Sequence, residues 1–415
     1  MRFGVVMYQT SFTGGQELVA QRMTRELNNQ GHQSYLISSP FHDGKLIPEY
    51  DRLRRSVEGY LLFGDSEFQV PIIRVDGYIS TWPPRRIMLR DFVRVLRDLV
   101  ERLRLDIIVS HSTLWNGPEE IAKFITWKRM MREQGLHEKE VLYIHMSHYQ
   151  PPDPARYNLI ERTFRAAWNN LVFPQIFKTA QLLLCVTPYE VKQMVALGAE
   201  KKRCHLYPGG IDKKAFKIHE SKDTSNFLKK YFIPRDSRII TYLGTIEERK
   251  NPLAVVKVAR KLRRMENIHF VIAGHPSNQD AIIRREAKIL ENVSYLGTIT
   301  EEAKIALIRS SYINILLSRM EALGLTQLEF MYGGVPVITS AVGGQKWVVR
   351  DGVDGFHLNG PDAIEGAIGM VEKLVSNPDL RDRLGENAKK RAKKYTLSKL
   401  TSNLVSRLTS EVQPS

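Results

Sequence analysis

Short apolar runs alternate along the first half of the chain with segments whose apolar residues recur at helical spacing. The strand-like runs are residues 3–9, 33–39, 71–75, 105–112 and 140–147, and the helical patterns are 17–30, 87–103 and 119–134. Buried strands that alternate with helices are typical of βαβ units and a parallel sheet. The pattern therefore predicts a doubly wound α/β domain.

A second alternating series occupies the later part of the chain. Its strand-like runs are 238–245, 268–274, 293–298, 312–318 and 335–340, and its helical patterns are 252–264, 279–290, 301–309 and 324–332. The break between the two series lies near residues 209–216, where two glycines allow a linker, and the polar stretch 219–226 follows. We therefore predict two Rossmann-like domains with parallel sheets.

Length and composition agree with this organisation. A chain of 415 residues is too long for one ordinary hydrophobic core. The 43% hydrophobic and 26% charged residues are typical of a soluble globular protein, and no run approaches the roughly 18 apolar residues of a membrane span. The apolar start is too short for a signal peptide, so we expect a cytoplasmic protein. Cys185 and Cys204 lack metal-ligand spacing, and we expect buried thiols.

The net charge of +16 indicates either an anionic partner or a solvated basic surface. The densest basic block is 389–394, on a predicted exposed helix, where a solvated face is the ordinary interpretation and contact with anionic lipid headgroups the alternative. We expect no nucleic acid partner, because the basic residues are spread through both halves and no aromatic-interleaved basic motif occurs.

The stretch 85–103 repeats apolar residues near helical spacing. Packing against the core is the ordinary interpretation of such a stripe. The alternative is a membrane-facing helix with Trp82, Arg85 and Arg86 at the interface, which would place the protein peripherally at the inner face of a membrane. A lipid-linked substrate would follow from that alternative.

Two carboxylates interrupt an apolar and glycine-rich segment at residues 318–344. Parallel sheets of this kind bind ligands outside the carboxyl ends of their strands, so Glu321 lies in a loop where chemistry is expected. Residues 324–332 predict a short helix that Gly333 and Gly334 can end. The backbone N–H groups of its first turn are free, which predicts a phosphate site at that terminus.

Glu329 lies on this predicted helix in a largely apolar setting. A buried carboxylate requires hydrogen-bond donors from the protein or from a ligand. Neighbouring backbone or an arginine could supply them, and so could the hydroxyls of a ribose or a sugar. Two acids beside a phosphate pocket suit a nucleotide-sugar.

These residues carry a resemblance to a known family. Glu321 and Glu329, with the glycines between and after them, resemble the Glu-x7-Glu signature of the retaining GT-B glycosyltransferases of family 4. The segments 14–36, 207–216 and 243–252 are similar to that family's first glycine loop and helix, interdomain segment and first C-domain loop. The resemblance covers nearly the whole chain. It implies an acceptor-binding domain at 1–208, joined by a C-terminal helix at 396–415, and a nucleotide-sugar-binding domain at 209–395.

The resemblance also implies roles for residues of the C-terminal domain. Glu321 would receive hydroxyls of the donor hexose and Glu329 the ribose of the nucleotide. The amides around Gly324, Leu325 and Thr326 would hold the diphosphate. Lys250 matches the lysine that neutralises the departing diphosphate, where negative charge builds as the glycosidic bond breaks.

The chain departs from the family pattern at two places. The family's arginine sits directly after a loop glycine, where this chain has Thr245, so Arg249 is the alternative cation for the diphosphate. The usual acid after the second glycine pair is missing, because Gly343 and Gly344 lead into 345–347. Trp347 is expected to pack against its neighbours, with stacking on a base or sugar as the alternative.

In the N-terminal domain, Gly14 and Gly15 match the loop that approaches the diphosphate. His111 and His145 match the two positions whose histidines line the acceptor and the reacting centre, whereas His148 has no such match. No Asp-x-Asp pair occurs in the chain. We therefore expect no metal site and no cofactor, with the lysine and the helix terminus stabilising the leaving group instead of a divalent ion.

The predicted function is transfer of a hexosyl unit from a nucleoside diphosphate sugar to an acceptor hydroxyl, with retention implied by the resemblance. The acceptor could be a sugar, a polyol or a lipid-linked glycan, and the base and hexose of the donor are not specified by the sequence. Two alternatives are a nucleotide-sugar epimerase on the same fold and a non-catalytic nucleotide-sugar-binding protein. The oligomeric state stays open.

Overall fold

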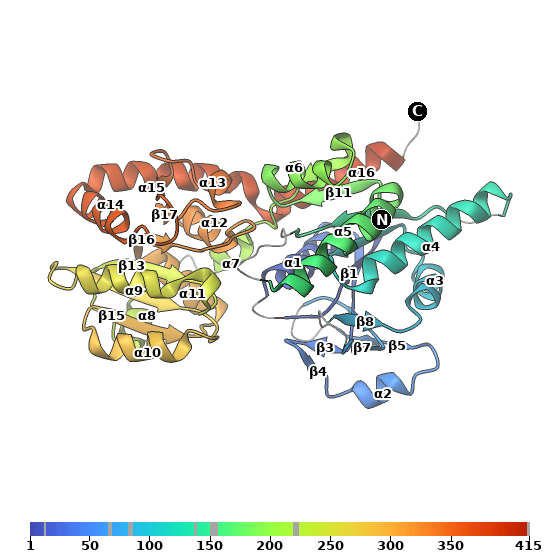
Figure 1. The fold of residues 1–415 in the computed structure, drawn as a ribbon, viewed down its shortest axis with the longest axis horizontal. Coiled ribbons are helices and arrows are strands. Elements are labelled where there is room, and N and C mark those ends of the chain that lie inside the picture. Colours follow the sequence, from blue (N-terminus) through green and yellow to red (C-terminus); the bar gives the residue numbers. More distant parts are fainter. Residues whose placement is uncertain are drawn as a thin grey trace. The chain divides into compact units, whose positions relative to one another are not determined.

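Two sheets built largely of parallel strands organise the protein, one in each of two units (Figure 1). The structure, a computed structural model, describes residues 1–11, 14–64, 69–81, 86–136, 139–149, 157–218 and 224–412. Unit 1 consists of residues 1–209 and 401–415, and unit 2 of residues 210–400. The first boundary lies one residue from the expected position after 208, and the return into unit 1 falls at 401 instead of 396.

Unit 1 contains an eight-stranded sheet in the order β12-β11-β10-β9-β1-β2-β6-β5. All neighbouring pairs are parallel except β5 with β6. The strands are β1 (Arg2–Met7), β2 (Gln33–Ser38), β5 (Tyr60–Phe63), β6 (Ile72–Val75), β9 (Ile107–His111), β10 (Leu142–Met146), β11 (Leu182–Cys185) and β12 (Cys204–Leu206). Two small antiparallel ribbons pair β3 (Phe41–His42) with β4 (Lys45–Leu46) and β7 (Gly77–Ile79) with β8 (Ile87–Leu89).

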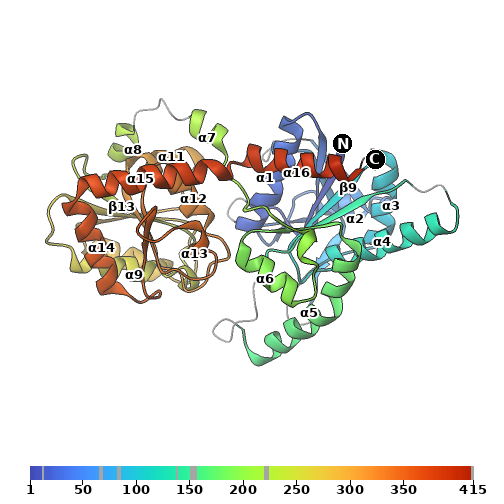
Figure 2. The same ribbon diagram turned by 90° about the horizontal axis from the view of Figure 1, so that it is seen from above.

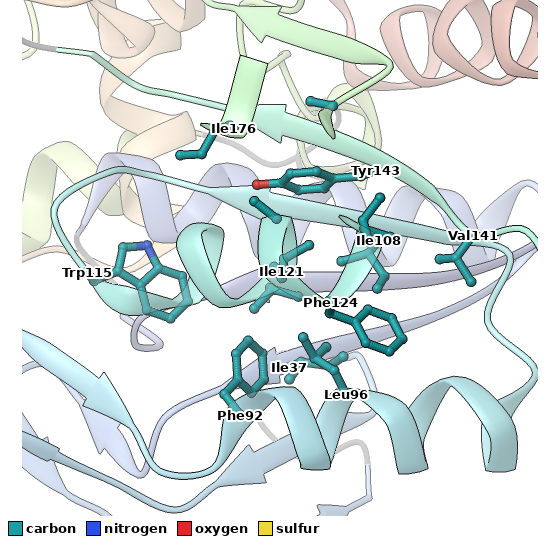
Figure 3. Close-up of a cluster of buried hydrophobic side chains, with 14 of the residues drawn as sticks. Ile37, Phe92, Leu96, Ile108, Trp115, Ile121, Phe124, Val141, Tyr143 and Ile176 are labelled. Carbon is teal, nitrogen blue, oxygen red and sulfur yellow. The ribbon is translucent and has the colours of Figure 1, made fainter. Parts of the chain in front are cut away.

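Helices pack around this sheet, as the two views of the ribbon show (Figures 1 and 2). They are α1 (Gly15–Asn29), α2 (Tyr50–Arg54), α3 (Phe92–Leu103), α4 (Asn116–Glu133), α5 (Leu159–Thr179), α6 (Pro188–Ala196) and most of α16 (Leu397–Val412). Figure 3 shows the core between sheet and helices, where Phe92 and Leu96 of α3 and Ile121 and Phe124 of α4 lie close to Ile108 of β9. The core consists mainly of branched aliphatic and aromatic residues.

The segment 87–103 is not one helix. Residues 87–89 form strand β8, because they pair with β7, and the helix begins only at Phe92. The apolar stripe of α3 is Phe92, Val95, Leu96, Leu99 and Val100, and all five are buried in the core of unit 1. Core packing is therefore the correct interpretation of this stripe. Trp82 and Arg85 lie outside the described residues.

Unit 2 contains a six-stranded parallel sheet in the order β15-β14-β13-β16-β17-β18. Its strands are β13 (Arg238–Leu243), β14 (Ile268–Ala273), β15 (Val293–Gly297), β16 (Ser311–Leu316), β17 (Val337–Thr339) and β18 (Gly355–His357). Its helices are α7 (Lys213–Ile218), α8 (Ser225–Lys230), α9 (Pro252–Lys261), α10 (Asp280–Ile289), α11 (Glu301–Ser310), α12 (Leu325–Tyr332), α13 (Gln345–Val348), α14 (Ile364–Ser376) and α15 (Pro378–Ala392). Short 3₁₀ turns occupy Lys201–Arg203, Glu248–Lys250 and Lys393–Tyr395.

Both faces of the unit 2 sheet are covered. Ile240 and Tyr242 of β13 belong to one buried cluster, whereas Ile239 and Leu243 belong to the other. Side chains of a strand alternate between the two faces of a sheet, so the two clusters lie on opposite faces. A parallel sheet buried on both faces is what a nearly continuous apolar strand predicts.

Three further expectations concern single features. Cys185 is buried, Cys204 is half-buried, and both thiols are free. Within the basic block 389–394, the four lysines are exposed and Ala392 is buried, as expected for a solvated helix face. In the part of the chain that the structure describes, no helix is both long and apolar enough to cross a membrane.

Candidate functional site

The strand order of unit 2 places its ligand crevice. Numbered along the sequence from β13, the order is 3-2-1-4-5-6, and the sheet changes winding direction between β13 and β16. Ligands of doubly wound sheets bind at such a switch point, outside the carboxyl ends of the strands. Lys250 follows β13 and Glu321 follows β16, so the topology brings both predicted residues to this point.

Lys250 and Glu321 are in direct contact, because the Nζ of Lys250 donates a hydrogen bond to the Oε2 of Glu321. The side chain of Glu321 is 9% exposed and that of Lys250 17%. Lys250 ends a 3₁₀ turn and is followed by Asn251, which has a left-handed backbone (φ +54°) and donates a side-chain hydrogen bond to the carbonyl of Pro361 (2.9 Å). The charge pair is therefore held by an ordered loop.

The glycine pair 343–344 positions the backbone of the Glu321 loop. The N–H of Gly344 donates to the carbonyl of Glu321 (3.0 Å). A Cβ at Gly343 would lie 2.1 Å from the oxygen of Glu321, and a Cβ at Gly344 would lie 2.1 Å from the oxygen of Ala322. Only glycine permits these approaches. The sequence pattern contains this pair but not its contact with the loop.

The N-terminus of α12 carries the predicted anion site. Gly324 precedes the helix with φ +89°, and no side chain caps the first turn. The N–H groups of Leu325 and Thr326 therefore lie in a turn without intrahelical acceptors. Gln327 was missed by sequence reasoning: it is fully buried, and neither polar atom of its amide has a hydrogen-bond partner among the described residues. Unpaired buried amides are destabilising unless a ligand satisfies them.

Glu329 lies on α12 and is 4% exposed. Its Oε1 accepts a hydrogen bond from the Nζ of Lys304 on α11 at 3.0 Å, and Lys304 also pairs with Glu301 at 2.9 Å. The partner is thus a lysine, neither of the two protein partners expected from the sequence. This ion pair compensates the burial of the Glu329 carboxylate. Its proposed contact with a ribose stays a prediction.

Arg249 ties the same loops together. Its Nη2 donates to the carboxylate of Glu247 (2.5 Å) and its Nη1 to the carbonyl of Met320 (3.4 Å). The N–H of Arg319 in turn donates to the carbonyl of Arg249 (2.8 Å). The carbonyl of Thr245 accepts from the hydroxyl of Tyr242 (2.9 Å). Arg249 therefore lies beside the Glu321 loop, but its guanidinium is already engaged by Glu247.

Trp347 packs against the protein, as expected. Its ring meets that of Tyr395 edge to face at 5.2 Å, and the guanidinium of Arg391 lies 5.7 Å from its centre. Arg391 also donates to the carbonyl of Val348 (2.8 Å).

In unit 1, the glycine loop precedes α1. A Cβ at Gly14 would lie 2.3 Å from the Oε2 of Glu17, whose carboxylate accepts hydrogen bonds from Tyr8 (2.5 Å) and Gln9 (2.9 Å). Gly14 is therefore required by packing within the protein. A Cβ at Gly15 would meet nothing within 4 Å, so the space beside Gly15 is open.

The two predicted histidines are completely buried at neighbouring strand ends. The Nδ1 of His145 is 2.8 Å from the hydroxyl of Ser110, which lies 2.9 Å from the hydroxyl of Tyr143. The Nδ1 of His111 is 3.1 Å from the Nε2 of His148. Ser110 and His111 are consecutive in β9, so these two hydrogen-bonded groups leave the strand on opposite faces of the sheet.

All three imidazoles are held neutral. Burial lowers the pKa of His145 to about 3 and that of His148 to about 3, and burial together with the neighbouring histidines lowers the pKa of His111 well below its ordinary value. The Nε2 atoms of His111 and His145 are buried and have no hydrogen-bond partner in the described ranges.

A cavity of about 320 Å³ opens in unit 1. The lining side chains that matter for its chemistry are Tyr8, Arg86, Ser112, Trp115, His148 and Arg165. Of the three histidines it is His148, the one without a family counterpart, that lines this cavity. Arg86 and Arg165 were missed as site residues, because no motif or spacing in the sequence marks them.

The backbone around the cavity is strained. Ser112 (φ +68°), Leu114 (φ +65°) and His148 (φ +47°) all have left-handed conformations, which are unfavourable for residues other than glycine. Glu190 fixes the last of these: its Oε1 accepts from the hydroxyl of Ser147 (2.5 Å) and from the N–H of Tyr149 (2.7 Å). Burial raises the pKa of Glu190. Strain of this kind is concentrated at functional sites.

No three His, Cys, Asp or Glu side chains of the described residues are grouped so that they could hold a metal ion.

Comparison with known proteins agrees with the site of unit 2 and with the fold of both units. Residues 223–391 match the family model described as Glycosyl transferases group 1, and residues 13–215 match Glycosyltransferase Family 4. Sucrose-phosphate synthase from Thermosynechococcus elongatus superimposes with a TM-score of 0.70 at 15% identity, covering 99% of this chain and 98% of that one. HepE from Anabaena, in complex with UDP and glucose, has a TM-score of 0.68 at 12% identity, covering 99% and 100%.

A curated relative shares recognisable sequence. The D-inositol 3-phosphate glycosyltransferase of Mycolicibacterium smegmatis is 29% identical over 212 residues, which are 49% of this chain and 48% of the relative. The matched region thus spans about half the length of that curated relative. The fold is the GT-B fold of glycosyltransferases. The chain belongs to the group 1 glycosyltransferase family, whose two models together match most of its length.

Proposed function

We propose that the protein transfers a hexosyl unit from a nucleoside diphosphate sugar to an acceptor hydroxyl, with retention of configuration at the anomeric carbon. The observation that carries this proposal is the Lys250–Glu321 ion pair at the switch point of unit 2. A cation and an acid in contact, beside an uncapped helix N-terminus, suit a ligand that has both a diphosphate and sugar hydroxyls.

The donor is bound by groups that are adjacent in the sequence of α12. The N–H groups of Leu325 and Thr326, which follow Gly324, hold the diphosphate, where the helix terminus favours negative charge. Glu329 receives the ribose diol through the carboxylate oxygen that Lys304 does not occupy. Glu321 receives hydroxyls of the hexose. Arg249 adds a second cation only if it exchanges Glu247 for the diphosphate.

Catalysis depends on stabilising the leaving group. The bond between the anomeric carbon and the diphosphate oxygen breaks, and negative charge builds on the diphosphate. Lys250 and the terminus of α12 neutralise this charge, and a diphosphate oxygen takes the proton of the acceptor hydroxyl as the new glycosidic bond forms. Since these groups supply the positive charge, we expect transfer without a divalent ion or other cofactor.

The glycine loop and the buried histidines belong to the same proposal. The open space at Gly15, next to Gly14, allows the backbone to approach a diphosphate. His111 and His145 each have an unpartnered Nε2 atom among the described residues, which a hydroxyl of the donor or acceptor would satisfy. As neutral imidazoles they would act by hydrogen bonding.

The test is a thermal-shift screen of UDP-, GDP- and ADP-hexoses, followed by assay of nucleoside diphosphate release with and without candidate acceptors. UDP-glucose comes first, because HepE has been crystallised with UDP-glucose as well as with UDP. NMR of the product then determines its anomeric configuration. Conversion of the donor without release of nucleoside diphosphate would indicate an epimerase, and binding without any turnover would indicate a non-catalytic protein.

A further inference from the structure

The cavity of unit 1 lies where a second ligand is expected. The sheet of unit 1 changes winding direction between β1 and β9, so its switch point lies outside the ends of these two strands. Tyr8, directly after β1, and Ser112 to Trp115, directly after β9, line the cavity. The cavity is therefore at the binding position of unit 1, whereas the proposed donor residues Lys250 and Glu321 belong to unit 2.

Arg86 contributes an unsatisfied positive charge to this cavity. Its guanidinium carbon lies 4.6 Å from the centre of the Trp168 ring and 5.0 Å from that of Phe164, both on α5. Its Nε and Nη1 atoms are buried and have no hydrogen-bond partner among the described residues. Aromatic rings hold the flat face of the guanidinium but leave its N–H edge to be paired. Unpaired charged donors of this kind are destabilising until an acceptor binds.

Arg165 supplies a second guanidinium to the same cavity. It lies on α5, and its guanidinium carbon is 3.9 Å from the centre of the Tyr157 ring. No carboxylate of the described residues lines the cavity. The nearby acids are engaged elsewhere: Glu17 accepts from Tyr8, and Glu119, whose charge acts on Arg86, pairs with Lys123 at 3.4 Å. The cavity therefore combines two cations without a compensating acid.

We propose that this cavity binds a phosphate ester, so that the acceptor is a phosphorylated sugar or polyol held by Arg86 and Arg165. The identification of the ligand as the acceptor rests on the proposed function, whereas the binding of a phosphate ester does not. Two guanidiniums match the double negative charge of a phosphomonoester, whose oxygens accept paired hydrogen bonds from the planar fork of arginine. A single arginine satisfies a carboxylate.

The remainder of the cavity suits the rest of such a molecule. Its volume of about 320 Å³ is at the small end of ligand pockets, which excludes a large glycan but accommodates one sugar or polyol unit. Ser112 and His148 supply polar groups, and Tyr8 and Trp115 supply apolar ring surface. The strained backbones of Ser112 and His148 present these groups in fixed positions.

The experiment measures binding to the full-length protein by calorimetry, without a donor. The probes are myo-inositol 3-phosphate against myo-inositol, and glucose 6-phosphate against glucose, with glucuronate as the carboxylate. We expect at least one phosphorylated probe to bind about tenfold or more tightly than its parent alcohol and than glucuronate. Equal binding of each phosphorylated probe and its alcohol, or tighter binding of glucuronate, would overturn the proposal.

Variants locate the site. Arg86→Gln and Arg165→Gln should each weaken the phosphorylated probe about tenfold or more. Arg97→Gln is the matched control, because Arg97 is an exposed arginine that also lies over a tryptophan, Trp127, at 5.0 Å, but outside the cavity. It should leave the affinity unchanged. Unchanged affinity in Arg86→Gln and Arg165→Gln would contradict the assignment, and Arg86→Lys replaces the first variant if Gln prevents folding.

Two further arms separate the possible sources of the phosphate and the two proposals. Binding of phosphatidylinositol vesicles, but of neither soluble ester nor neutral vesicles, assigns the phosphate to a lipid headgroup at the same arginines. UDP affinity, measured in parallel, reports on unit 2. If UDP-sugars fail to bind while the phosphate ester binds through Arg86, the proposed transferase function is wrong and the anion site stands. If UDP-sugars turn over without any preference for a phosphorylated acceptor, the reverse holds.

Discussion

Lys250 and Glu321 are 71 residues apart in the sequence, and their side chains form an ion pair at the point where the sheet of unit 2 changes direction. Each residue is at the end of a loop that follows a central strand. The contact fixes a cation and an acid next to the N-terminus of α12. This arrangement is the basis of the predictions for donor binding.

The substitution Lys250→Ala should lower the rate of transfer, and of slow donor hydrolysis, by about 10²–10³-fold or more, because one group that stabilises the leaving diphosphate is lost. Release of nucleoside diphosphate measures both reactions. Lys261→Ala is the control, since Lys261 is an exposed lysine whose acidic partner, Glu365, is 4.0 Å away. Turnover at the wild-type rate in Lys250→Ala would contradict the role of this residue.

The two acids should separate donor affinity into parts. Glu329→Ala removes a charged hydrogen-bond acceptor for the ribose and should weaken binding of the bare nucleoside diphosphate by about 1.5–3 kcal/mol. Glu321→Ala should leave that affinity unchanged and impair use of the sugar. Calorimetry with nucleoside diphosphate alone compares the variants. Lys304→Ala shows how much of the loss comes from the ion pair of Glu329, and equal losses in both acid variants would refute the assignment.

The adjacent glycines of unit 1 should respond differently to the same substitution. Gly14→Ala places a Cβ 2.3 Å from the Glu17 carboxylate and should lower the free energy of unfolding by about 1–3 kcal/mol. Gly15→Ala adds a methyl group to open space at the first position of α1 and should change stability by less than about 1 kcal/mol. If a diphosphate approaches there, this variant will still lose donor turnover. Chemical denaturation and the release assay together decide, and full turnover in Gly15→Ala would show that the loop makes no close approach.

The buried histidines should make stability depend on pH. In the unfolded chain they take up protons near pH 6.5, whereas folded His145 and His148 stay neutral down to about pH 3. Protons therefore bind preferentially to the unfolded state in this window, so stability is complete above about pH 6.5 and falls as the pH decreases. Each histidine contributes up to about 1.4 kcal/mol per pH unit.

Urea unfolding between pH 8 and pH 5 measures this dependence. His145→Gln and His148→Asn should each flatten the slope below pH 6.5, even if they lower stability at pH 8. An unchanged slope would contradict the effect of burial. By the same reasoning, turnover should show no pH limb between about pH 5 and 8 from these imidazoles.

Much of the fold and part of the site follow from local patterns. Apolar runs of strand length, alternating with helical spacing, predict two parallel α/β sheets, because each strand must bury both faces. The segment 312–332 places Glu321 in a loop and Glu329 on a short helix, since strand, glycine and helix signals are all local there. The same patterns mistook residues 87–89 for helix, because their pairing with β7 is a contact that spacing does not show.

What the tertiary structure decided are the contacts between distant segments. It paired Lys250 with Glu321 and Glu329 with Lys304, and it placed Gly344 against the Glu321 loop. It also brought Arg86 and Arg165 to one cavity, although nothing in the sequence near either residue distinguishes it from the other arginines of a basic chain. The physical reason is that periodicity records which face of an element is buried, whereas charge pairing and cavities depend on which elements the topology makes neighbours.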